Sequence, residues 1–190
     1  MKRLYETRLY LALIHYPVTN KNGEIIASAL TNFDLHDIAR AACTFGVKGF
    51  YCVTPLKDQQ EIAKSIASHW QTGFGSEYNP KRQQALNLIS VCDTIADAVE
   101  NITALENGVK PKIVTTSAQK MAGCVDFASL KRSLADDKPH LLLFGTAWGL
   151  CPEVFDSADF ILEPIEGGTG YNHLSVRSAA SIMLDRLDRA

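Results

Sequence analysis

The feature that most constrains the fold is an alternation of short apolar runs with segments whose apolar residues recur at helical spacing. Residues 9–15 and 49–53 are the first two apolar runs, and they predict buried strands. Each is followed by a helical pattern, over residues 34–46 and 58–70, and Asp34 is expected to cap the first of these helices. Strands that alternate with helices are typical of a mostly parallel sheet.

The second half of the chain continues this alternation. Gly and polar residues predict a loop over 72–82, and an apolar segment follows at 85–91. The remaining patterns predict a helix at 93–107, strands at 112–115, 140–144 and 160–162, and a terminal helix at 174–187. We therefore expect an α/β fold, with a mostly parallel sheet and helices on both faces, and residues 1–190 as a single domain.

Composition narrows the classes of function. A net charge of -2 argues against strong nonspecific binding to nucleic acid, so an RNA partner would need a local basic patch. No apolar run reaches the roughly 20 residues of a membrane span, and no signal peptide opens the chain. These features predict no membrane partner. The five cysteines are scattered without zinc-ligand spacing, which predicts a cytoplasmic protein with no metal.

Three loops that follow late strands carry the features of a small-molecule site. Residues 115–117, 145–149 and 165–174 together hold five glycines and several hydroxyl groups. Their backbone groups either line a pocket for a polar, planar ligand or only form tight turns. The fingerprints GxGxxG and GxxxxGK[ST] are absent, which argues against a Rossmann dinucleotide site and against a P-loop.

Three motifs carry a resemblance to a known superfamily. The segment EPIEGGTGYNHLSVRSA at 163–179 closely resembles the last motif of the SPOUT RNA methyltransferases. LLFGTAWGL at 142–150 resembles their middle motif, and residues 32–46, with Arg40 before two alanines, resemble the first. The whole chain is similar to a small subgroup related to tRNA guanosine-N1 methyltransferase, which occurs alone or beside that enzyme.

The resemblance implies a function and an architecture. It implies transfer of a methyl group from S-adenosylmethionine (SAM) to a nucleoside of tRNA or rRNA, by a homodimer with a C-terminal trefoil knot. Two alternatives remain: a non-catalytic SAM- or RNA-binding partner of another RNA-modification enzyme, and an enzyme that uses another nucleotide at the same loops. One departure concerns Ala147, where the family pattern leads us to expect glycine, and a positive φ there would strain the turn.

The resemblance also implies which residues form the site. Arg40, Asn172 and Arg177 are the catalytic candidates. The residues expected to bind the cofactor lie in and next to the three loops, and they are Thr115, Thr116, Ser117, Phe144, Gly145, Thr146, Gly149, Leu162, Ile165, Gly167, Tyr171, His173, Leu174 and Ser175.

Each catalytic candidate also has a structural interpretation. Arg40 either orients an RNA phosphate or hydroxyl, or points to solvent or pairs with Asp37. Asn172 either contacts the substrate or is a turn residue with positive φ. Arg177 either binds a carboxylate or phosphate, or forms an ion pair with Glu163 or Glu166.

Two further features have an uncertain role. His36, beside Asp37, would suit a general base if it faced the cofactor, although isolated histidines are more often structural. Lys81 and Arg82, with Tyr78 and Trp70 nearby, form a basic patch with aromatic neighbours. This patch either holds single-stranded RNA or is solvated loop charge, and the second interpretation is favoured.

Overall fold

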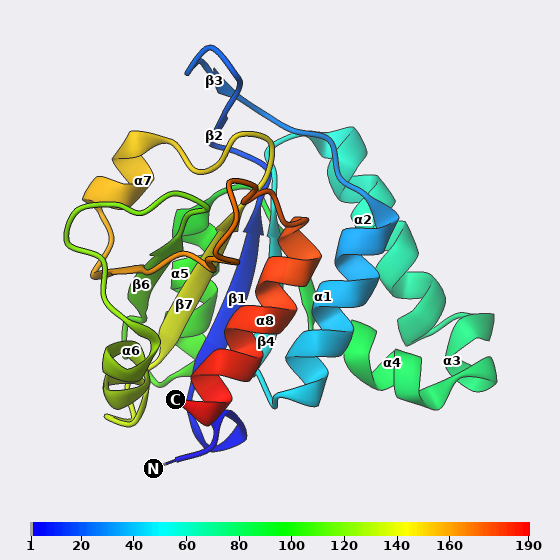
Figure 1. Cartoon of the computed structure of the whole chain (residues 1–190). Helices are drawn as coiled ribbons and strands as arrows, with labels where there is room; N and C mark the ends of the chain where they lie inside the picture. Colours follow the sequence, from blue (N-terminus) through cyan, green and yellow to red (C-terminus); the bar gives the residue numbers. More distant parts are fainter. Residues whose placement is uncertain (1) are drawn as a thin grey trace.

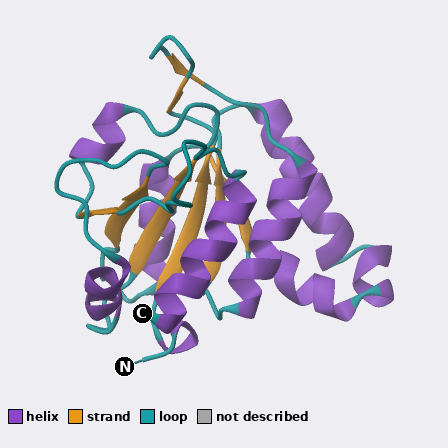
Figure 2. Cartoon of the chain, in the orientation of Figure 1, coloured by secondary structure: helices purple, strands orange, loops and turns teal. Residues whose placement is uncertain are grey.

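A six-stranded parallel sheet forms the centre of the molecule (Figures 1 and 2). The computed structural model describes residues 2–190. The strands, in spatial order, are β5 (Ile89–Cys92), β4 (Gly49–Val53), β1 (Leu9–Ile14), β7 (His140–Gly145), β6 (Lys112–Thr116) and β8 (Phe160–Leu162). Every pair within this sheet is parallel, which confirms the α/β prediction.

Helices cover both faces of the sheet, and this explains why its central strand β1 is buried along its whole length. On β1, Leu11 and Leu13 face one core, whereas Tyr10 and Ala12 face the other. Both cores are buried, so neither face of the strand can be polar. The first core is covered by α1 (Asn32–Thr44), α2 (Lys57–Gln71), α4 (Pro80–Leu86), α6 (Phe127–Leu134) and α8 (Val176–Arg189), and the second by α5 (Ile95–Leu105) and α7 (Pro152–Asp156).

The residue that caps α1 differs from the prediction. Thr31, whose backbone is extended, is the N-cap, and its hydroxyl accepts from the amide of Asp34 at 3.3 Å. Asp34 lies three residues further on and accepts the Thr31 hydroxyl at 2.6 Å. The Asp34 carboxylate thereby lies inside the first helical turn, where the helix dipole favours negative charge.

The predicted loop at 72–82 is wrong. These residues form α3 (Phe74–Tyr78) and the start of α4. Asn79 caps α4 by accepting from the amide of Arg82 at 3.0 Å, and Pro80 occupies the first turn. The Asn-Pro pair that suggested a loop is therefore a helix start, because proline fits the first helical turn.

Several short elements lack a clear periodic signal in the sequence. They are η1 (Leu4–Glu6), α6, α7 and the antiparallel pair β2 (Val18–Thr19) and β3 (Ile25–Ile26). A turn over residues 20–23 joins β2 to β3, and the carbonyl of Asn20 accepts the amide of Gly23 at 3.0 Å. This hairpin stands above the carboxyl edge of the sheet (Figure 1).

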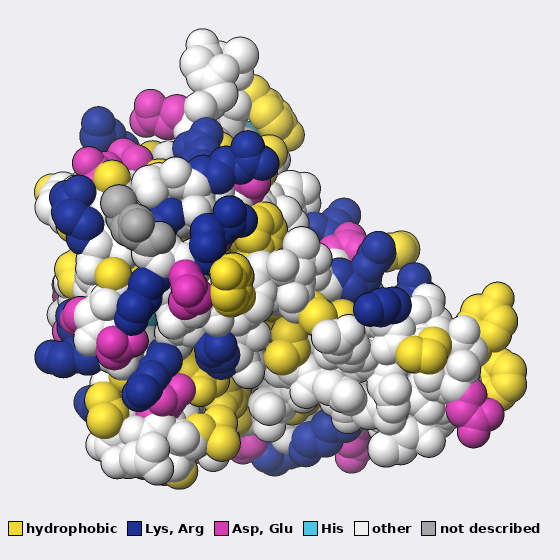
Figure 3. All heavy atoms as spheres, turned by 90° about the horizontal axis from the view of Figure 1, so that it is seen from below, with side chains coloured by type: hydrophobic (Ala, Val, Ile, Leu, Met, Phe, Trp, Pro, Cys, Tyr) yellow, Lys and Arg dark blue, Asp and Glu magenta, His cyan; other side chains and the backbone are white. Residues whose placement is uncertain are grey.

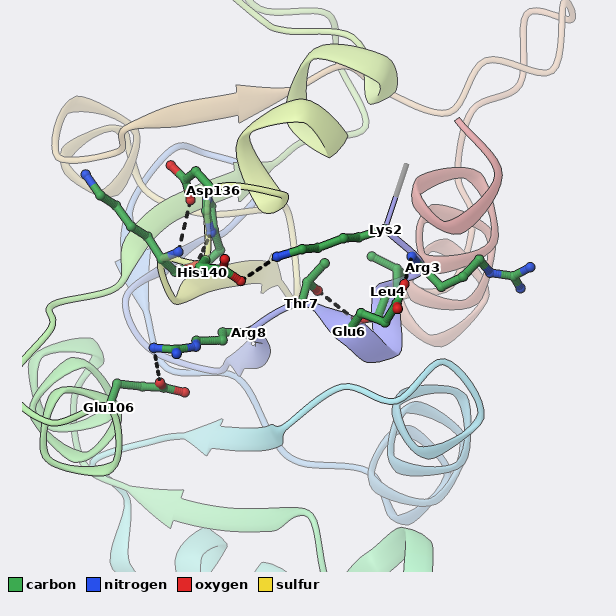
Figure 4. A network of polar contacts seen from close by, with 11 residues as sticks. Lys2, Arg3, Leu4, Glu6, Thr7, Arg8, Glu106, Asp136 and His140 are labelled. Atoms are coloured by element: carbon green, nitrogen blue, oxygen red, sulfur yellow. Dashed lines mark hydrogen bonds and ion pairs between the residues drawn. The ribbon is translucent and has the colours of Figure 1, made fainter.

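A group of polar contacts lies at the opposite edge of the sheet, where the strands begin (Figure 4). Arg8 bonds Glu106 at 3.1 Å, and Arg3 pairs with Asp188 of α8. His140 is buried, and its ring nitrogens contact a backbone carbonyl and a serine hydroxyl. Each of these groups is satisfied within the fold, so this edge is structural.

Candidate functional site

The three predicted loops lie together at the carboxyl edge of the sheet, where α/β folds bind ligands (Figure 1). The clearest link between them is Asn172, whose Nδ2 donates to the carbonyl of Ala118 at 2.6 Å. Asn172 belongs to the loop after β8, and Ala118 to the loop after β6. Its φ is not positive, so the prediction of a left-handed turn residue is wrong and its amide instead joins two loops.

The turn after β7 needs its first glycine because of its own backbone. A Cβ at Gly145 would lie 2.7 Å from the amide nitrogen of Leu150, which is closer than real Cβ atoms come. Ala147 has a φ of 51°, in the left-handed region that disfavours residues with a Cβ. The expectation that Ala147 strains this turn is therefore met.

The β2–β3 hairpin holds the same turn from the other side. The amide of Thr19 donates to Gly149 at 2.9 Å, and the amide of Trp148 donates to Thr19 at 3.1 Å. Val18 also bridges to Leu150. The turn is thus fixed by backbone contacts with a segment more than 100 residues away in the sequence.

A buried chain of side chains supports Thr146 from below. The Thr146 hydroxyl donates to the carbonyl of Ile14 at 2.9 Å and lies 2.5 Å from the hydroxyl of Ser28. Because Thr146 has one proton, Ser28 donates to it, and the Nδ1–H of His15 donates to Ser28 at 2.9 Å. The connection of His15 to the turn is a feature that sequence reasoning missed, since His15 has no motif spacing.

This arrangement leaves His15 neutral. Its side chain is 1% exposed, and Nε2 has no hydrogen-bond partner within residues 2–190. Burial lowers the pKa of His15 to about 4, an effect opposed by the negative charge of Asp34. His15 therefore carries no charge near neutral pH.

The predicted cofactor residues divide into those used by the fold and those open to a ligand. The Thr115 and Thr116 hydroxyls donate to the carbonyls of Phe160 and Leu143, at 3.3 and 2.9 Å. The Ser117 hydroxyl accepts the amide of Gln119 at 3.0 Å. These side chains hold strands and loops in place, so a ligand here would meet mainly backbone groups.

The remaining predicted cofactor residues surround this backbone. Phe144, Leu162 and Ile165 are buried beneath the loops, and Ser175 caps α8, where its hydroxyl accepts the amide of Ser178. Tyr171 and Leu174 are exposed, and the Tyr171 ring lies edge-on to His173 at 5.3 Å.

The loops fit a ligand that approaches their backbone closely. A Cβ placed at Gly149 or Gly167 would meet no atom within 4 Å, so the chain leaves open space at these positions. Open glycine backbone at a strand end suits an elongated, polar cofactor such as SAM, which needs amide and carbonyl partners.

Two of the catalytic candidates lie on a groove between α1 and α8. Arg40 and Arg177 line a hollow of about 610 Å³, whose apolar wall includes Ala41, Phe45 and Ile182. Arg177 forms ion pairs with Asp34 at 3.0 Å and Asp37 at 3.5 Å, so the structural alternative, an ion pair with Glu163 or Glu166, is wrong in its partners.

Asp34 and Asp37 position the Arg177 guanidinium, a role with no sequence signal because the two helices are more than 100 residues apart. Arg40 is exposed and forms no ion pair within residues 2–190, so its alternative pairing with Asp37 is absent.

His36 occupies a different environment from the one that a general base needs. Its ring lies edge-on to Trp70 of α2, with centroids 5.6 Å apart. Burial lowers the pKa of His36, and the positive charge of Arg82 adds to this effect.

Residues 2–190 contain no cluster of three metal-ligating side chains, and none of their helices is long and apolar enough to cross a bilayer.

Comparison with known proteins assigns the chain to a class. A family model described as SAM-dependent RNA methyltransferase matches residues 8–189. The chain belongs to this family, whose cofactor is SAM.

Individual relatives agree with this assignment. The chain is 47% identical over 179 residues to a tRNA (guanine-N(1)-)-methyltransferase of Oleidesulfovibrio alaskensis, matching 94% of this chain but 41% of that protein. It therefore spans less than half the length of this relative. An uncharacterized protein of Aquifex aeolicus is 36% identical and is matched over 94% of this chain and 87% of its own length.

The fold is shared with solved SPOUT-type structures. The SpoU methyltransferase AviRb of Streptomyces viridochromogenes, solved with the cofactor AdoMet, has a TM-score of 0.55 and 19% identity. The match covers 97% of this chain and 58% of that chain. At this level of identity the likeness concerns the fold.

Proposed function

We propose that the chain transfers a methyl group from SAM to a nucleoside of RNA, in a tRNA or an rRNA. The observation that carries the proposal is the convergence of three loops at the carboxyl edge, two of them rich in glycine, with the loops after β6 and β8 joined by the bond from Asn172 to Ala118. Membership of the family, over residues 8–189, supplies the cofactor class.

The chain's contribution to catalysis is positioning. SAM supplies an electrophilic methyl group, so the reaction needs a nucleophile in line and within about 3–3.5 Å. The backbone at Gly145 and Gly149 holds the cofactor, and Asn172 fixes the covering loop through Ala118. Arg40, which is exposed and unpaired within residues 2–190, binds an RNA phosphate or hydroxyl beside Arg177.

We further propose that residues 1–190 act as one domain with a C-terminal trefoil knot. Strand β8 pairs with β6 at the edge of the sheet, whereas α8 packs against α1 and β7. The intervening chain must cross back over the strand ends, and Asn172 brings it against the loop after β6. This route supports threading beneath that loop.

The α1–α8 groove supports a homodimer. Its apolar wall, with Phe45 and Ile182, is a surface that a second copy could cover. A cytoplasmic location is proposed from the five cysteines, all of which are free thiols.

One observation favours the alternative of a non-catalytic partner protein. Ala147 has a positive φ in the turn that would hold the cofactor. A strained turn of this kind would lower the affinity for SAM. In that case the chain would bind SAM weakly or not at all and would act beside another modification enzyme.

The test begins with calorimetric titration by SAM, with ATP and NAD as competing candidates. We expect SAM alone to bind, and the purified chain to transfer labelled methyl groups from SAM to total tRNA or rRNA. Arg40→Ala should lower transfer while leaving SAM affinity unchanged. Weak or absent SAM binding, or SAM binding without transfer to either RNA, would favour the non-catalytic alternative, and preference for ATP or NAD would contradict the proposal.

A further inference from the structure

The most exposed aromatic rings of the molecule stand on a projection made by α3 and α4 (Figure 1). Phe74 is 74% exposed and Tyr78 is 77% exposed. Their rings are stacked, with centroids 6.2 Å apart and planes at 22°. Two large parallel rings in water are costly for a structure that does not use them, because their apolar faces remain hydrated.

Two cations, Lys81 and Arg82, lie on α4, the helix that follows α3. The guanidinium of Arg82 lies over the ring of Trp70, 4.7 Å from its centroid. Within residues 2–190, Lys81 and Arg82 form no ion pair, although other arginines, such as Arg8 and Arg177, do. Figure 3 shows hydrophobic side chains at the tip of the projection and Lys and Arg side chains on its flank. We call Trp70, Phe74, Tyr78, Lys81 and Arg82 the aromatic–basic arm.

The arm packs against α1, the helix that also carries Arg40. Helix α4 contacts α1, and His36 of α1 lies edge-on to Trp70. Arg40 lies on the same helix and lines the α1–α8 groove. Of the acidic groups nearby, Asp37 is engaged by Arg177, and Glu77 is exposed on α3.

We infer that the aromatic–basic arm binds an unpaired segment of the substrate RNA. Unstacked bases would stack on Phe74 and Tyr78, and the adjoining phosphates would contact Lys81 and Arg82. A local site of this kind would let the chain bind RNA although its net charge is negative. The inference rests on the proposed function and adds to it a second contact region, outside the cofactor loops.

The test measures RNA binding by fluorescence anisotropy in the presence of SAM. The probes are a fluorescein-labelled RNA stem–loop with an unpaired loop and a blunt RNA duplex of equal length. The double variant Phe74→Ala/Tyr78→Ala should bind the stem–loop about 10- to 100-fold more weakly, with little change for the duplex. Tyr5→Ala, at an exposed tyrosine near the N-terminus, is the matched control.

The charged half of the arm has a separate signature. Arg82→Gln should lower stem–loop affinity and reduce the slope of log affinity against log salt by about 0.7, as expected for one lost single-strand phosphate contact. Arg132→Gln on α6, which also removes an arginine without an ion pair, should leave both quantities unchanged. The double aromatic variant should weaken binding without changing the salt slope.

Calorimetric SAM binding by each variant separates this inference from the proposed function. Wild-type affinity for the stem–loop in the double variant would overturn the role of the arm, while SAM binding and methyl transfer would still support the proposed function. A second outcome would also overturn the inference. If the wild type self-associates and the double variant is monomeric but binds RNA normally, the arm is a protein interface.

Discussion

At the residue scale, two positions in the candidate site are held in conformations that cost stability. Ala147 has a left-handed backbone, and His15 keeps an unpartnered nitrogen in the interior. Both are connected to the turn after β7. Ala147 is part of this turn, and His15 is linked to it through hydrogen bonds of Ser28 and Thr146. Strain and unsatisfied groups persist where the surrounding structure determines them, and functional sites are the usual place.

Ala147→Gly should stabilise the chain. Glycine removes the left-handed penalty of about 1 kcal/mol, partly offset by the greater freedom of glycine in the unfolded chain. We expect a small rise in the free energy of unfolding, measured by urea denaturation, and equal or tighter SAM binding. The control is Ala118→Gly, at an exposed alanine without positive φ, which should destabilise. Equal destabilisation by both changes would contradict the assignment of strain.

The pKa of His15 predicts a pH dependence of stability. The folded-state pKa is lowered from 6.5 to about 4, so the neutral form stabilises the fold. This contribution is fully present above pH 6.5 and is lost as the pH falls through 4, with a total of roughly 3 kcal/mol. His15→Asn should therefore flatten the fall in the free energy of unfolding between these pH values.

The comparison with wild type isolates this group. The pKa values of His36 and His140 are also lowered by burial, but both residues are common to the two proteins. An unchanged pH slope in the variant would show that His15 does not carry the effect.

At the scale of elements, the site is built from strand ends and from the segments that hold them. The turn after β7 is fixed by the β2–β3 hairpin, and the loop after β8 is held to the loop after β6. None of these contacts lies within a single helix or strand. The cofactor loops therefore depend on the register of the sheet, which sets where each strand ends.

Gly145→Ala should disrupt the turn. The new Cβ would lie 2.7 Å from the amide nitrogen of Leu150, so the backbone must move. We expect SAM affinity to fall at least about tenfold and stability to fall by about 1–3 kcal/mol, measured by calorimetry and urea unfolding. Gly167→Ala, where a Cβ meets nothing within 4 Å, should leave stability within about 0.5 kcal/mol of wild type. Normal SAM binding by Gly145→Ala would refute the close packing of this turn.

At the scale of the whole molecule, the proposed interfaces lie on different parts of the surface. The groove between α1 and α8 is partly apolar, and the arm of α3 and α4 projects from the same side of the sheet as α1 (Figure 1). A second copy in the groove would cover Phe45 and Ile182 and leave the arm exposed. The dimer is therefore compatible with an RNA contact at the arm, whereas Arg40 lines the groove itself and would share that surface with the second copy.

Ile182→Asp should dissociate the proposed homodimer. A buried, unpaired carboxylate in the apolar wall of the groove would cost several kcal/mol on association. Light scattering coupled to size-exclusion chromatography should report a dimer for wild type and a monomer for the variant. The control Ile62→Asp, at an exposed isoleucine of α2, should remain dimeric. A monomeric wild type would contradict the proposed dimer, and a dimeric Ile182→Asp variant would place the interface elsewhere.

The sequence by itself determined five of the six strands of the parallel sheet, the long helices and their parallel arrangement, but not β5, β2 or β3. Buried strands such as β1 and β7 are apolar along their length, and α1, α2, α5 and α8 have helical periodicity, because burial is encoded locally. The glycine-bearing loops after β6, β7 and β8 also followed, since loops are placed by the strands that precede them.

The tertiary structure alone decided how these parts meet. The pairing of Arg177 with Asp34, the link from Asn172 to Ala118 and the route from His15 to Thr146 join segments far apart in the chain. The stacking of Phe74 and Tyr78 depends on α3, because one helical turn brings side chains four residues apart together. Such contacts depend on sheet order and helix packing, which side-chain periodicity does not specify.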